Sequence, residues 1–492
     1  MLRTKARYRV EKDTLGEKKV PLAAYYGIQT LRAKENFPIS GIPPKKEFII
    51  ATAMVKAAAC VTNCGLGLLD RRRCRAITRA AQEIISGKLH AEFIVDVYQA
   101  GAGTSHNINA NEVIANRAIE LLGGKKGDYS YARGATPARG ATPIHPNDHV
   151  NMGQSTNDVI PTAMRLSALE SSEKFLSALK ALEKALHLKS REFDRIIKSG
   201  RTHLQDAVPI RLGQEFGSYA AGIRASIERI NCAKERLKNI GLGGTAVGTG
   251  LNAHPAYRKK VIKELGRISG IKGLRAAPDA FEALNSMADF SFFSGALRTT
   301  AVELIRISND LRLLSSGPRT GLAEITLPAV QPGSSIMPGK VNPVMAEMLA
   351  MVCFQVIGND MAVTMAAQAG QLELNVMTPV INYNCLESIG ILDSAVRAFT
   401  ERCVKGIKAD KKRCREYFER TAGLATILNR LIGYEKAATV AKESAATGKG
   451  IKEIVLEKGI LTEKEWKRLL EPMRVTTAVD FIEGTGKRRQ SR

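Results

Sequence analysis

The chain has 492 residues, of which 44% are hydrophobic and 25% are charged, a balance that excludes a disordered or fibrous protein. Its 73 basic and 48 acidic residues give a formal net charge of +25. Such a charge suits either nucleic-acid binding or the attraction of small anions. The basic residues are dispersed and no aromatic residues are interleaved with them, so we favour a solvated basic surface over nucleic-acid binding.

The first residues and the cysteines favour a cytoplasmic protein. The segment Met1–Lys5 lacks the apolar stretch of a secretory signal, and no uninterrupted apolar run approaches the ~18 residues of a membrane span. The eight cysteines are scattered. Cys60 and Cys64 lie one helical turn apart, but no second close pair completes a zinc site. We therefore expect reduced thiols in packed helices and no bound metal.

The N-terminal part of the chain predicts short elements followed by helices. Residues 1 to about 50 are rich in Gly, Pro and charged residues, and alanine-rich patterns broken by glycine follow up to about 125. Residues 132–137 read ARGATP, and the same six residues are repeated at 138–143. This duplication cannot easily extend a helix, so we interpret it as a surface loop insertion and assign it no chemistry. We assign 1–152 to a mostly helical N-terminal domain.

The middle of the chain predicts long helices. Two segments carry apolar residues at steps of three, four and seven, which places those residues on one helix face. They are Leu176, Leu179, Leu182, Leu186, Phe193 and Ile197, and then Phe216, Tyr219, Ile223, Ile227, Ile230, Leu237 and Ile240. A third pattern at 281–314 is apolar on most sides, and two more follow at about 344–372 and 379–405. A helix that is apolar all round must be buried, so we expect a bundle at 153–406 that is completed by oligomerisation. Shorter helices separated by glycines predict a small C-terminal domain at 407–492.

Signatures of nucleotide enzymes and of serine hydrolases do not fit this sequence. Gly333–Lys340 has five residues between its glycines where a phosphate loop has four, and Val341 stands where a magnesium-binding Ser or Thr is needed. Gly241–Ala246 resembles a dinucleotide fingerprint only loosely, without a strand–helix–strand unit around it. The sequence contains no Gly-x-Ser-x-Gly nucleophile turn.

Four polar segments interrupt the apolar helical pattern. They read GAGTSHNINANE (101–112), HPNDHVNMGQSTND (145–158), GRTHLQDAVP (200–209) and GSSIMPGKVNP (333–343). Each one alone is compatible with a loop or a helix cap, because Ser, Thr, Asn and Asp favour those places. Together they supply hydroxyls, amides, histidine and one lysine with few carboxylates. That combination suits an anionic substrate held by neutral donors and one cation.

The segment 333–343 is the most informative of the four. Its two glycines and two prolines predict an irregular loop, and the adjacent Ser334 and Ser335 on such a loop are hard to explain by packing. We interpret the segment as a lid that closes over a substrate and brings a reactive hydroxyl with it.

With all four segments in this order, the chain resembles the aspartase/fumarase superfamily, for which GSSIMPGKVNP is the hallmark loop. The resemblance extends from about Tyr8 to the final helices. Three stretches are closer to the aspartate ammonia-lyases than to the class II fumarases: AAYYGIQTLRAKENF (23–37), DVYQAGAGTSHNINANEV (96–113) and QLELNVMTPVINYN (371–384). The duplication at 132–143 and the high positive charge depart from the family.

This resemblance implies a mainly α, three-domain fold. In that fold the long central helices form the twenty-helix core of a homotetramer, and each active site is built from three subunits. The implied reaction is the reversible deamination of L-aspartate to fumarate and ammonia through an aci-carboxylate intermediate. No cofactor and no catalytic metal are implied, and the only partner besides the other subunits is a small dicarboxylate.

The resemblance also assigns roles to individual residues. Ser334 would be the general base that removes the Cβ proton, because loop closure supplies donors and positive charge to its hydroxyl. The carboxylate that accumulates charge would be bound by Thr104, Ser155, Thr156 and Ser335. The other carboxylate would be held by Lys340 and Asn342. The leaving amino group would be surrounded by Asn157, Thr202 and His203, with Glu347 orienting His203. His106 and His145 would lie near the site.

Two other functions stay open at this stage. The first is class II fumarate hydratase, in which water takes the place of ammonia and L-malate that of L-aspartate. The second is a basic nucleic-acid-binding protein that keeps a lyase scaffold, which the net charge of +25 leaves open.

Overall fold

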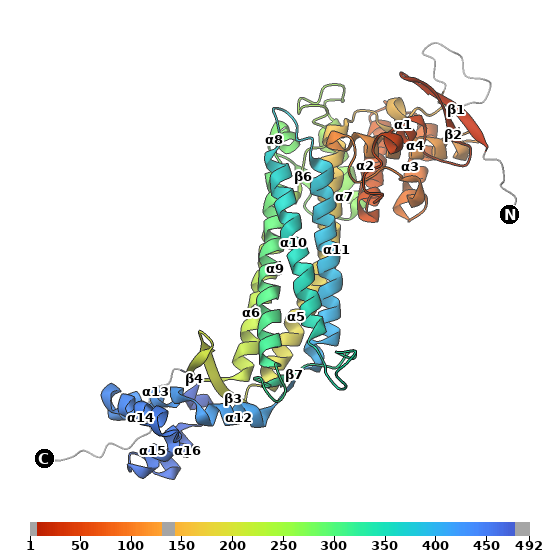
Figure 1. Cartoon of the computed structure of the whole chain (residues 1–492). Coiled ribbons are helices and arrows are strands. Elements are labelled where there is room, and N and C mark those ends of the chain that lie inside the picture. The colour runs from red at the N-terminus through yellow and green to blue at the C-terminus, as the bar shows by residue number, and fades with distance from the viewer. Residues whose placement is uncertain (1–6, 130–142, 478–492) are drawn as a thin grey trace. The chain divides into compact units, whose positions relative to one another are not determined.

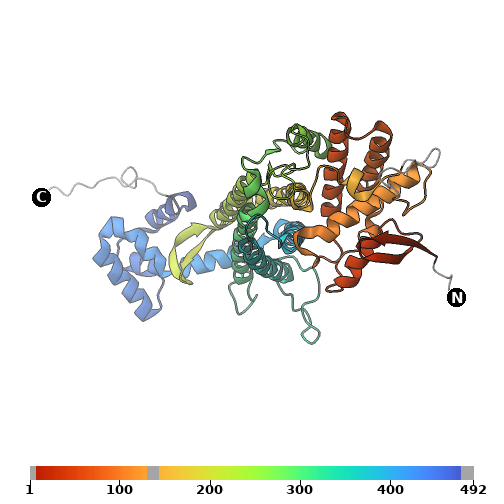
Figure 2. The ribbon, with the colours of Figure 1, turned by 90° about the horizontal axis from the view of Figure 1, so that it is seen from above.

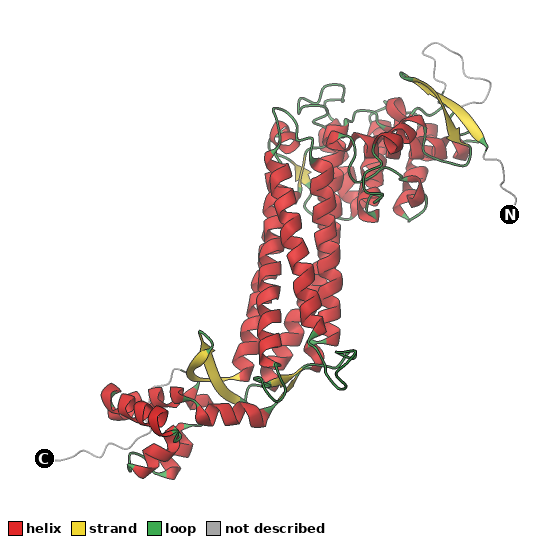
Figure 3. Cartoon of the chain, viewed as in Figure 1, coloured by secondary structure: helices red, strands yellow, loops and turns green. Residues whose placement is uncertain are grey.

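The computed structural model describes residues 7–129 and 143–477 (Figure 1). The expected mainly α fold is confirmed, with 63% helix (Figure 3). Of the ARGATP duplication only Pro143 is described, so the loop interpretation lies outside the described residues. Contacts divide the chain into two units, one made of residues 1–177, 226–302 and 352–394, the other of 178–225, 303–351 and 395–492. The division into three domains stays a prediction.

Five long helices each contribute one segment to each unit. They are α5 (Thr156–Glu192), α6 (Leu212–Leu237), α9 (Ala288–Leu314), α10 (Val344–Gln368) and α11 (Thr378–Arg402). Within each unit these segments pack side by side (Figures 1 and 2). Their inward faces bury leucine, isoleucine and phenylalanine side chains, as the apolar spacing predicts.

Two ends of the expected helices are wrong, and a third helix is not continuous. The pattern of 176–197 continues past the end of α5 into β3 (Ile197–Thr202), and Ile240 belongs to β5 (Asn239–Ile240). The segment 281–314 is interrupted between α8 (Ala280–Asn285) and α9, where the Ser286 hydroxyl accepts from the backbone N–H of Ala288. Burial explains all three errors, because apolar side chains that flank a helix are buried in the same core as the helix itself.

The N-terminal part of the first unit begins with an antiparallel hairpin of β1 (Tyr8–Asp13) and β2 (Gly16–Pro21). The helices α1 (Ile28–Asn36), α2 (Lys46–Gly65), α3 (Arg71–Ile85) and α4 (Thr104–Leu121) follow. Buried alanines dominate the contact between α2, α3 and α4, which lets these helices pack closely. The predicted arm with short elements, followed by alanine-rich helices, is confirmed.

The same unit also contains α7 (Tyr257–Ser269) and a short parallel pair of β5 with β6 (Arg275–Ala276). The second unit carries the antiparallel hairpin of β3 with β4 (Gln205–Arg211) and the pair of β7 (Ile325–Thr326) with β8 (Lys408–Ala409).

A cluster of C-terminal helices completes the second unit. They are α12 (Lys411–Arg420), α13 (Ala425–Ile432), α14 (Tyr434–Thr447), α15 (Ile451–Glu457), α16 (Glu463–Leu469) and α17 (Pro472–Val475). These helices have a small apolar core of their own, built around Leu428, Ile454 and Trp466.

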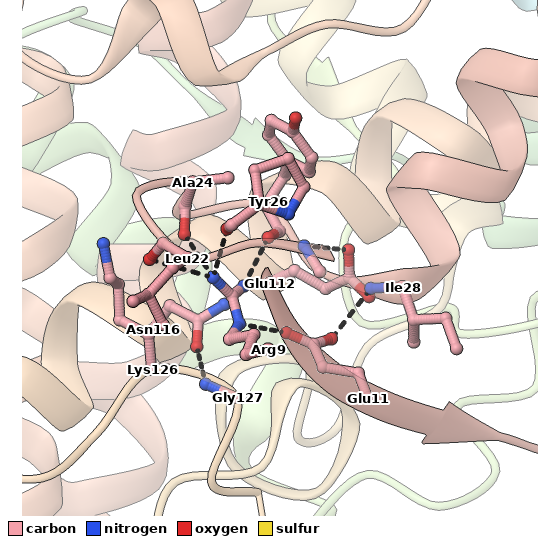
Figure 4. Close-up of polar contacts among 12 residues, drawn as sticks. Arg9, Glu11, Leu22, Ala24, Tyr26, Ile28, Glu112, Asn116, Lys126 and Gly127 are labelled. Carbon is pink, nitrogen blue, oxygen red and sulfur yellow. Dashed lines mark hydrogen bonds and ion pairs between the residues drawn. The ribbon is translucent and has the colours of Figure 1, made fainter. Parts of the chain in front are cut away.

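A buried polar cluster ties the N-terminal hairpin to α1 and α4 (Figure 4). Glu112 on α4 is 2% exposed, and its carboxylate accepts from the backbone N–H groups of Gly27, Gln29 and Thr30 at the start of α1. Burial raises the pKa of Glu112. The carboxylate thus takes up the free N–H groups at a helix N-terminus, as a capping side chain does, but from a distant part of the chain.

The cluster leaves no room for a side chain at position 27. A Cβ on Gly27 would lie 2.7 Å from the Glu112 Cδ and 2.8 Å from the Glu11 Oε2. We expect Gly27→Ala to destabilise the protein by about 1–3 kcal/mol, the usual cost of overpacking a buried site, and to lower the melting temperature at fixed protein concentration. The matched control is Gly65→Ala at the end of α2, where an added Cβ meets no atom within 4 Å. Equal melting temperatures for the two variants would contradict this expectation.

Candidate active site

The first unit brings together two of the four polar segments. Thr104 is the first residue of α4, and Thr156 is the first residue of α5. The Asn107 side-chain amide donates to the Thr156 hydroxyl (3.1 Å) and thereby joins the first turns of the two helices. Ser155 precedes α5, and its hydroxyl accepts from the backbone N–H of Asn157 (3.3 Å). Two helix N-termini that carry hydroxyls lie next to each other here, an arrangement suited to a carboxylate.

A buried lysine supports this arrangement. Lys56 on α2 is fully buried and donates from Nζ to the Asn151 Oδ1 (2.7 Å) and the Gln154 Oε1 (3.1 Å). Burial lowers the pKa of Lys56 to about 7, although the charge of Asp158 opposes the shift. Asp158 is also buried, and it accepts from the backbone N–H of Ser155 (2.9 Å). The pair therefore fixes both the loop before α5 and the start of the helix.

Lys56 lies outside the four polar segments and is not among the predicted site residues. A usable signal exists, because it is the only charged residue in the apolar stretch Phe48–Leu69. Lysine is rarely fully buried unless it is paired. Asn107 and Asp158 lie in the polar segments but are not among the predicted site residues either.

In the second unit, Thr202 and His203 lie at the tip of the β3–β4 hairpin. Thr202 pairs with Gln205, so His203 and Leu204 form the two-residue turn, with φ of 55° and 60°. Such turns favour Asn-Gly, since a side chain with positive φ is strained. All four residues are exposed, and the Leu204 side chain is 70% exposed. A strained tip that buries nothing within its own chain is typical of a functional position.

An ion cluster holds the base of this hairpin. Lys198 on β3 is 1% exposed and lies 2.7 Å from the Glu324 Oε2 and 2.9 Å from the Glu215 Oε1. Arg201 donates to the other oxygen of Glu324 (2.9 Å), which is fully buried. Because β7 begins directly after Glu324, one carboxylate links the hairpin to the chain that leads into the predicted lid.

The predicted lid is an irregular, largely exposed loop, as expected. The backbone N–H of Gly333 donates to the carbonyl of Lys340 (2.8 Å), and the Asn342 side-chain amide donates to the carbonyl of Gly333 (2.7 Å). These bonds close the loop at its base. A Cβ on Gly333 would lie 2.4 Å from the Lys340 carbonyl oxygen, so only glycine permits this approach. At the tip, the Ile336 side chain is 83% exposed.

Within this loop, Ser334 has the surroundings of a reactive hydroxyl. Its Oγ accepts from the backbone N–H groups of Ile336 (3.2 Å) and Met337 (3.0 Å). Two preorganised donors on one hydroxyl oxygen favour its deprotonated form over the neutral one. Ser335 lies next to it and is exposed.

Lys340 and Asn342 line a cavity of about 760 Å³ in the second unit. Arg312, Lys412 and Arg413 line it as well, against the two carboxylates of Asp410 and Glu416, so the wall beside the lid carries a net positive charge. This charge favours the approach of an anionic ligand.

Some predicted residues lie close together and others do not. Thr104, Ser155, Thr156 and Asn157 lie together in the first unit. Ser334, Ser335, Lys340 and Asn342 share the lid, and Glu347 follows in the first turn of α10. No hydrogen bond or ion pair joins His203 to Glu347 in the described residues, so their pairing stays a prediction. The assigned roles also stay predictions.

The two histidines placed near the site differ in character. His106 is fully buried and stacks on Phe48 with ring centroids 4.3 Å apart, and burial lowers its pKa to about 3. His145 is partly exposed and caps the helical turn Pro146–Val150, with its Nδ1 3.4 Å from the Asp148 Oδ2. His106 is therefore a neutral core residue, whereas the His145 side chain remains in contact with solvent.

Comparison with known proteins identifies the family. Residues 16–358 match the family described as "Lyase", and residues 424–477 match "Fumarase C C-terminus". The chain belongs to the lyase family. An aspartate ammonia-lyase of Bacillus subtilis (strain 168) is 50% identical over 97% of this chain and 98% of that protein. A class II fumarate hydratase of Xylella fastidiosa (strain Temecula1) is 44% identical over 98% of both chains.

A solved lyase structure agrees with this assignment. The crystal structure of a fumarate lyase:delta crystallin from Brucella melitensis bound to cobalt is 50% identical, with a TM-score of 0.91. It covers 96% of this chain, and all of that chain is matched. Both the sequence and the fold of this chain therefore confirm the expected resemblance to the superfamily.

Proposed function

We propose that this lyase is an aspartate ammonia-lyase, which interconverts L-aspartate with fumarate and ammonia. The near full-length similarity to an aspartate ammonia-lyase at 50% identity carries the proposal. Ser334 on its exposed loop, with two amides on Oγ, supplies the chemistry that such a reaction needs.

The reaction begins with loss of a proton from the Cβ atom of aspartate. This C–H bond is weakly acidic, because its electrons move into a carboxylate that is already charged. The Ser334 oxygen, in its deprotonated form, takes the proton and becomes a neutral hydroxyl. The hydroxyls of Thr104 and Thr156, with those of Ser155 and Ser335, stabilise the doubly charged aci-carboxylate. Lys340 and Asn342 hold the other carboxylate, the lysine through a charge-assisted hydrogen bond.

The second step breaks the C–N bond. The electrons of the aci-carboxylate return to form the double bond of fumarate, and ammonia leaves from the neighbouring carbon. Asn157, Thr202 and His203 surround the amino group, and Glu347 orients His203. The residues of this chain do all of this work, and the mechanism calls for no cofactor.

One assay tests the proposal. Purified protein is mixed with L-aspartate or, separately, with L-malate, and fumarate is followed by its ultraviolet absorbance. We expect fumarate from aspartate. Fumarate from malate alone would favour the class II fumarate hydratase, to which the 44% identity with the Xylella protein also points. Activity with neither substrate, together with salt-sensitive nucleic-acid binding, would favour the nucleic-acid-binding protein.

The active protein is a homotetramer in this proposal, with each site built from three subunits. The best support is α10, which is an apolar helix. In the single chain, only 39% of its most apolar stretch is buried. Its length and composition would also suit a membrane span, as would those of α2, but α2 is 72% buried in its own unit. On α10, one face exposes Met351, Phe354, Met361 and Met365, each between 55% and 63% exposed. Steps of three, four and seven residues make this a continuous stripe that a second copy would cover.

A charge on that stripe should break the assembly. We expect Met361→Glu to convert the tetramer into smaller species in light scattering coupled to size-exclusion chromatography, because an unpaired carboxylate cannot be buried in an apolar interface. The control is Tyr434→Glu, which places the same charge on an exposed aromatic residue outside α10 (76% exposed). A Met361→Glu protein that stays tetrameric would contradict the proposed interface.

We also propose a cytoplasmic location. All eight cysteines are free thiols, which a reducing compartment favours. Labelling of the intact cell with a reagent that does not cross the membrane should leave the protein unlabelled.

A further inference from the structure

Three cysteines meet between α2 and α3, outside the candidate active site. Cys60 and Cys64 lie one turn apart on α2, and Cys74 lies near the start of α3. The Cys60 Sγ is 3.6 Å from the carbonyl oxygen of Cys74, and the Cys74 Sγ is 3.9 Å from that of Cys60. A helical carbonyl points along the axis toward the residue four positions on, so the Cys74 sulfur lies between the levels of Cys60 and Cys64. Its thiol is within hydrogen-bonding reach of both.

The surroundings of Cys74 favour its thiolate. The residue ends the first turn of α3, where the helix dipole is positive, and Arg71, Arg72, Arg73 and Arg75 surround it in the sequence. The nearest acid, Asp70, is engaged as the N-cap of α3 and in an ion pair with Arg73. Hydrogen bonding from Cys60, opposed by burial and then reinforced by Cys64 and Thr78, lowers the pKa of Cys74 to about 6. A thiolate that is partly exposed and next to another thiol is the usual setting of an oxidant-sensitive cysteine.

The two neighbouring thiols differ in their access to solvent. Cys60 is 1% exposed, and its sulfur accepts a hydrogen bond from the Thr78 hydroxyl (3.7 Å). Cys64 is partly exposed, as is Cys74. A metal site is not the explanation, since the described residues hold no group of three or more His, Cys, Asp or Glu arranged for an ion.

We propose that Cys74 and Cys64 form a redox pair, in which a peroxide oxidises Cys74 and Cys64 resolves the product as a disulfide. In the first step the Cys74 thiolate attacks the peroxide: an S–O bond forms, the O–O bond breaks, and the sulfur loses two electrons to the peroxide, which leaves as the alkoxide or hydroxide. In the second step the Cys64 sulfur attacks the Cys74 sulfenic acid. The S–S bond forms, the S–O bond breaks, and the hydroxide leaves as water with the thiol proton of Cys64.

The reactivity of Cys74 is measured on the wild-type protein. Alkylation by iodoacetamide is followed by mass spectrometry across a pH series, with Cys232, which is exposed and outside the cluster, as internal reference. We expect the rate at Cys74 to fall as the pH drops through about 6, because only the thiolate reacts. A midpoint near that of an ordinary thiol, about 8.5, would overturn the assignment of a thiolate.

The disulfide is tested with hydrogen peroxide. Trypsin cuts after Lys56, Arg71, Arg73 and Arg75, so the pair would appear as the peptide 57–71 linked to 74–75, with the loss of two hydrogens. We expect this linked peptide from the wild-type protein and its disappearance on reduction. Failure to detect it after peroxide treatment that oxidises other thiols would overturn the proposal.

Two variants separate the roles of the cysteines. Cys64→Ser should stop the reaction at the Cys74 sulfenic acid, which a dimedone probe traps, whereas Cys60→Ser should still form the disulfide. If Cys64→Ser forms a disulfide as fast as the wild-type protein does, Cys60 is the partner and the pairing with Cys64 is wrong. All readouts are masses of peptides, so they do not depend on whether the protein deaminates aspartate.

Discussion

Replacing Ser334 by alanine should lower kcat for aspartate deamination by about 10³-fold or more and leave the oligomeric state unchanged. A general base contributes about 10²- to 10⁴-fold, and no other hydroxyl on the lid accepts two backbone N–H groups in the described residues. The change removes one exposed-loop oxygen and leaves the loop base intact, where Gly333 bonds to Lys340. Substrate binding should therefore be retained.

The sharpest readout for Ser334 is exchange of the Cβ proton. In D2O the wild-type protein should exchange this proton of aspartate with solvent, and Ser334→Ala should not, even where slow turnover remains. The matched variant is Ser335→Ala, which removes the neighbouring hydroxyl but keeps the base, so exchange should continue at a reduced rate. A Ser334→Ala protein with kcat within about tenfold of the wild type would show that another group is the base.

The sequence predicts the helices of this protein better than their ends. The spacing of Leu176, Leu179 and Leu182 reports a helix face, because a 3.6-residue period leaves a clear mark in a long amphipathic helix. The same spacing continues to Ile197, which lies in a strand. Burial alone cannot mark the end of a helix, since the core accepts apolar side chains from any element.

For the candidate site, the sequence predicts the residues that meet solvent or substrate and misses those behind them. Ser334 and His203 lie in polar segments that stand out in an apolar chain. Glu324 has no such context, and the sequence marks Lys56 only as a single charge in an apolar stretch. The partners of both residues come from distant segments. A long-range ion pair leaves no local pattern. Only the folded chain shows that these two residues hold the loop before α5 and the β3–β4 hairpin.

The proposed assembly would explain two features that a single chain does not. Neither the strained turn at His203 nor the exposed stripe on α10 contributes to the core of its own unit. Both are explained if other copies of the chain cover them. In the sequence, such a contact between copies is indicated only by apolar residues that have no core of their own chain to enter, such as Leu204 and Met361.

Removing the charge of Glu324 should cause the largest loss of stability. Its carboxylate is fully buried and neutralises Lys198 and Arg201, so Glu324→Gln would leave Arg201 without its acidic partner and Lys198 with Glu215 alone. Breaking a buried ion pair from one side costs about 3–5 kcal/mol, whereas an exposed pair contributes about 0–1 kcal/mol. The control is Glu183→Gln, which breaks the partly exposed pair with Arg224 in the same unit. We expect a large drop in melting temperature for the first variant and almost none for the second.

The same variant tests whether the ion cluster positions His203. Glu324 lies at the base of the hairpin, so a cluster that only stabilises the fold would lower the melting temperature and leave the kinetics below it unchanged. If the cluster also positions the tip, amide hydrogen exchange should speed up in residues 197–211, and kcat/KM should fall at temperatures where the protein is still folded. The double variant Glu324→Gln with His203→Ala distinguishes a stabilising role of the ion cluster from a role in positioning His203. Because the hairpin acts through His203, the kinetic losses should not add, whereas independent sites would give additive free energies.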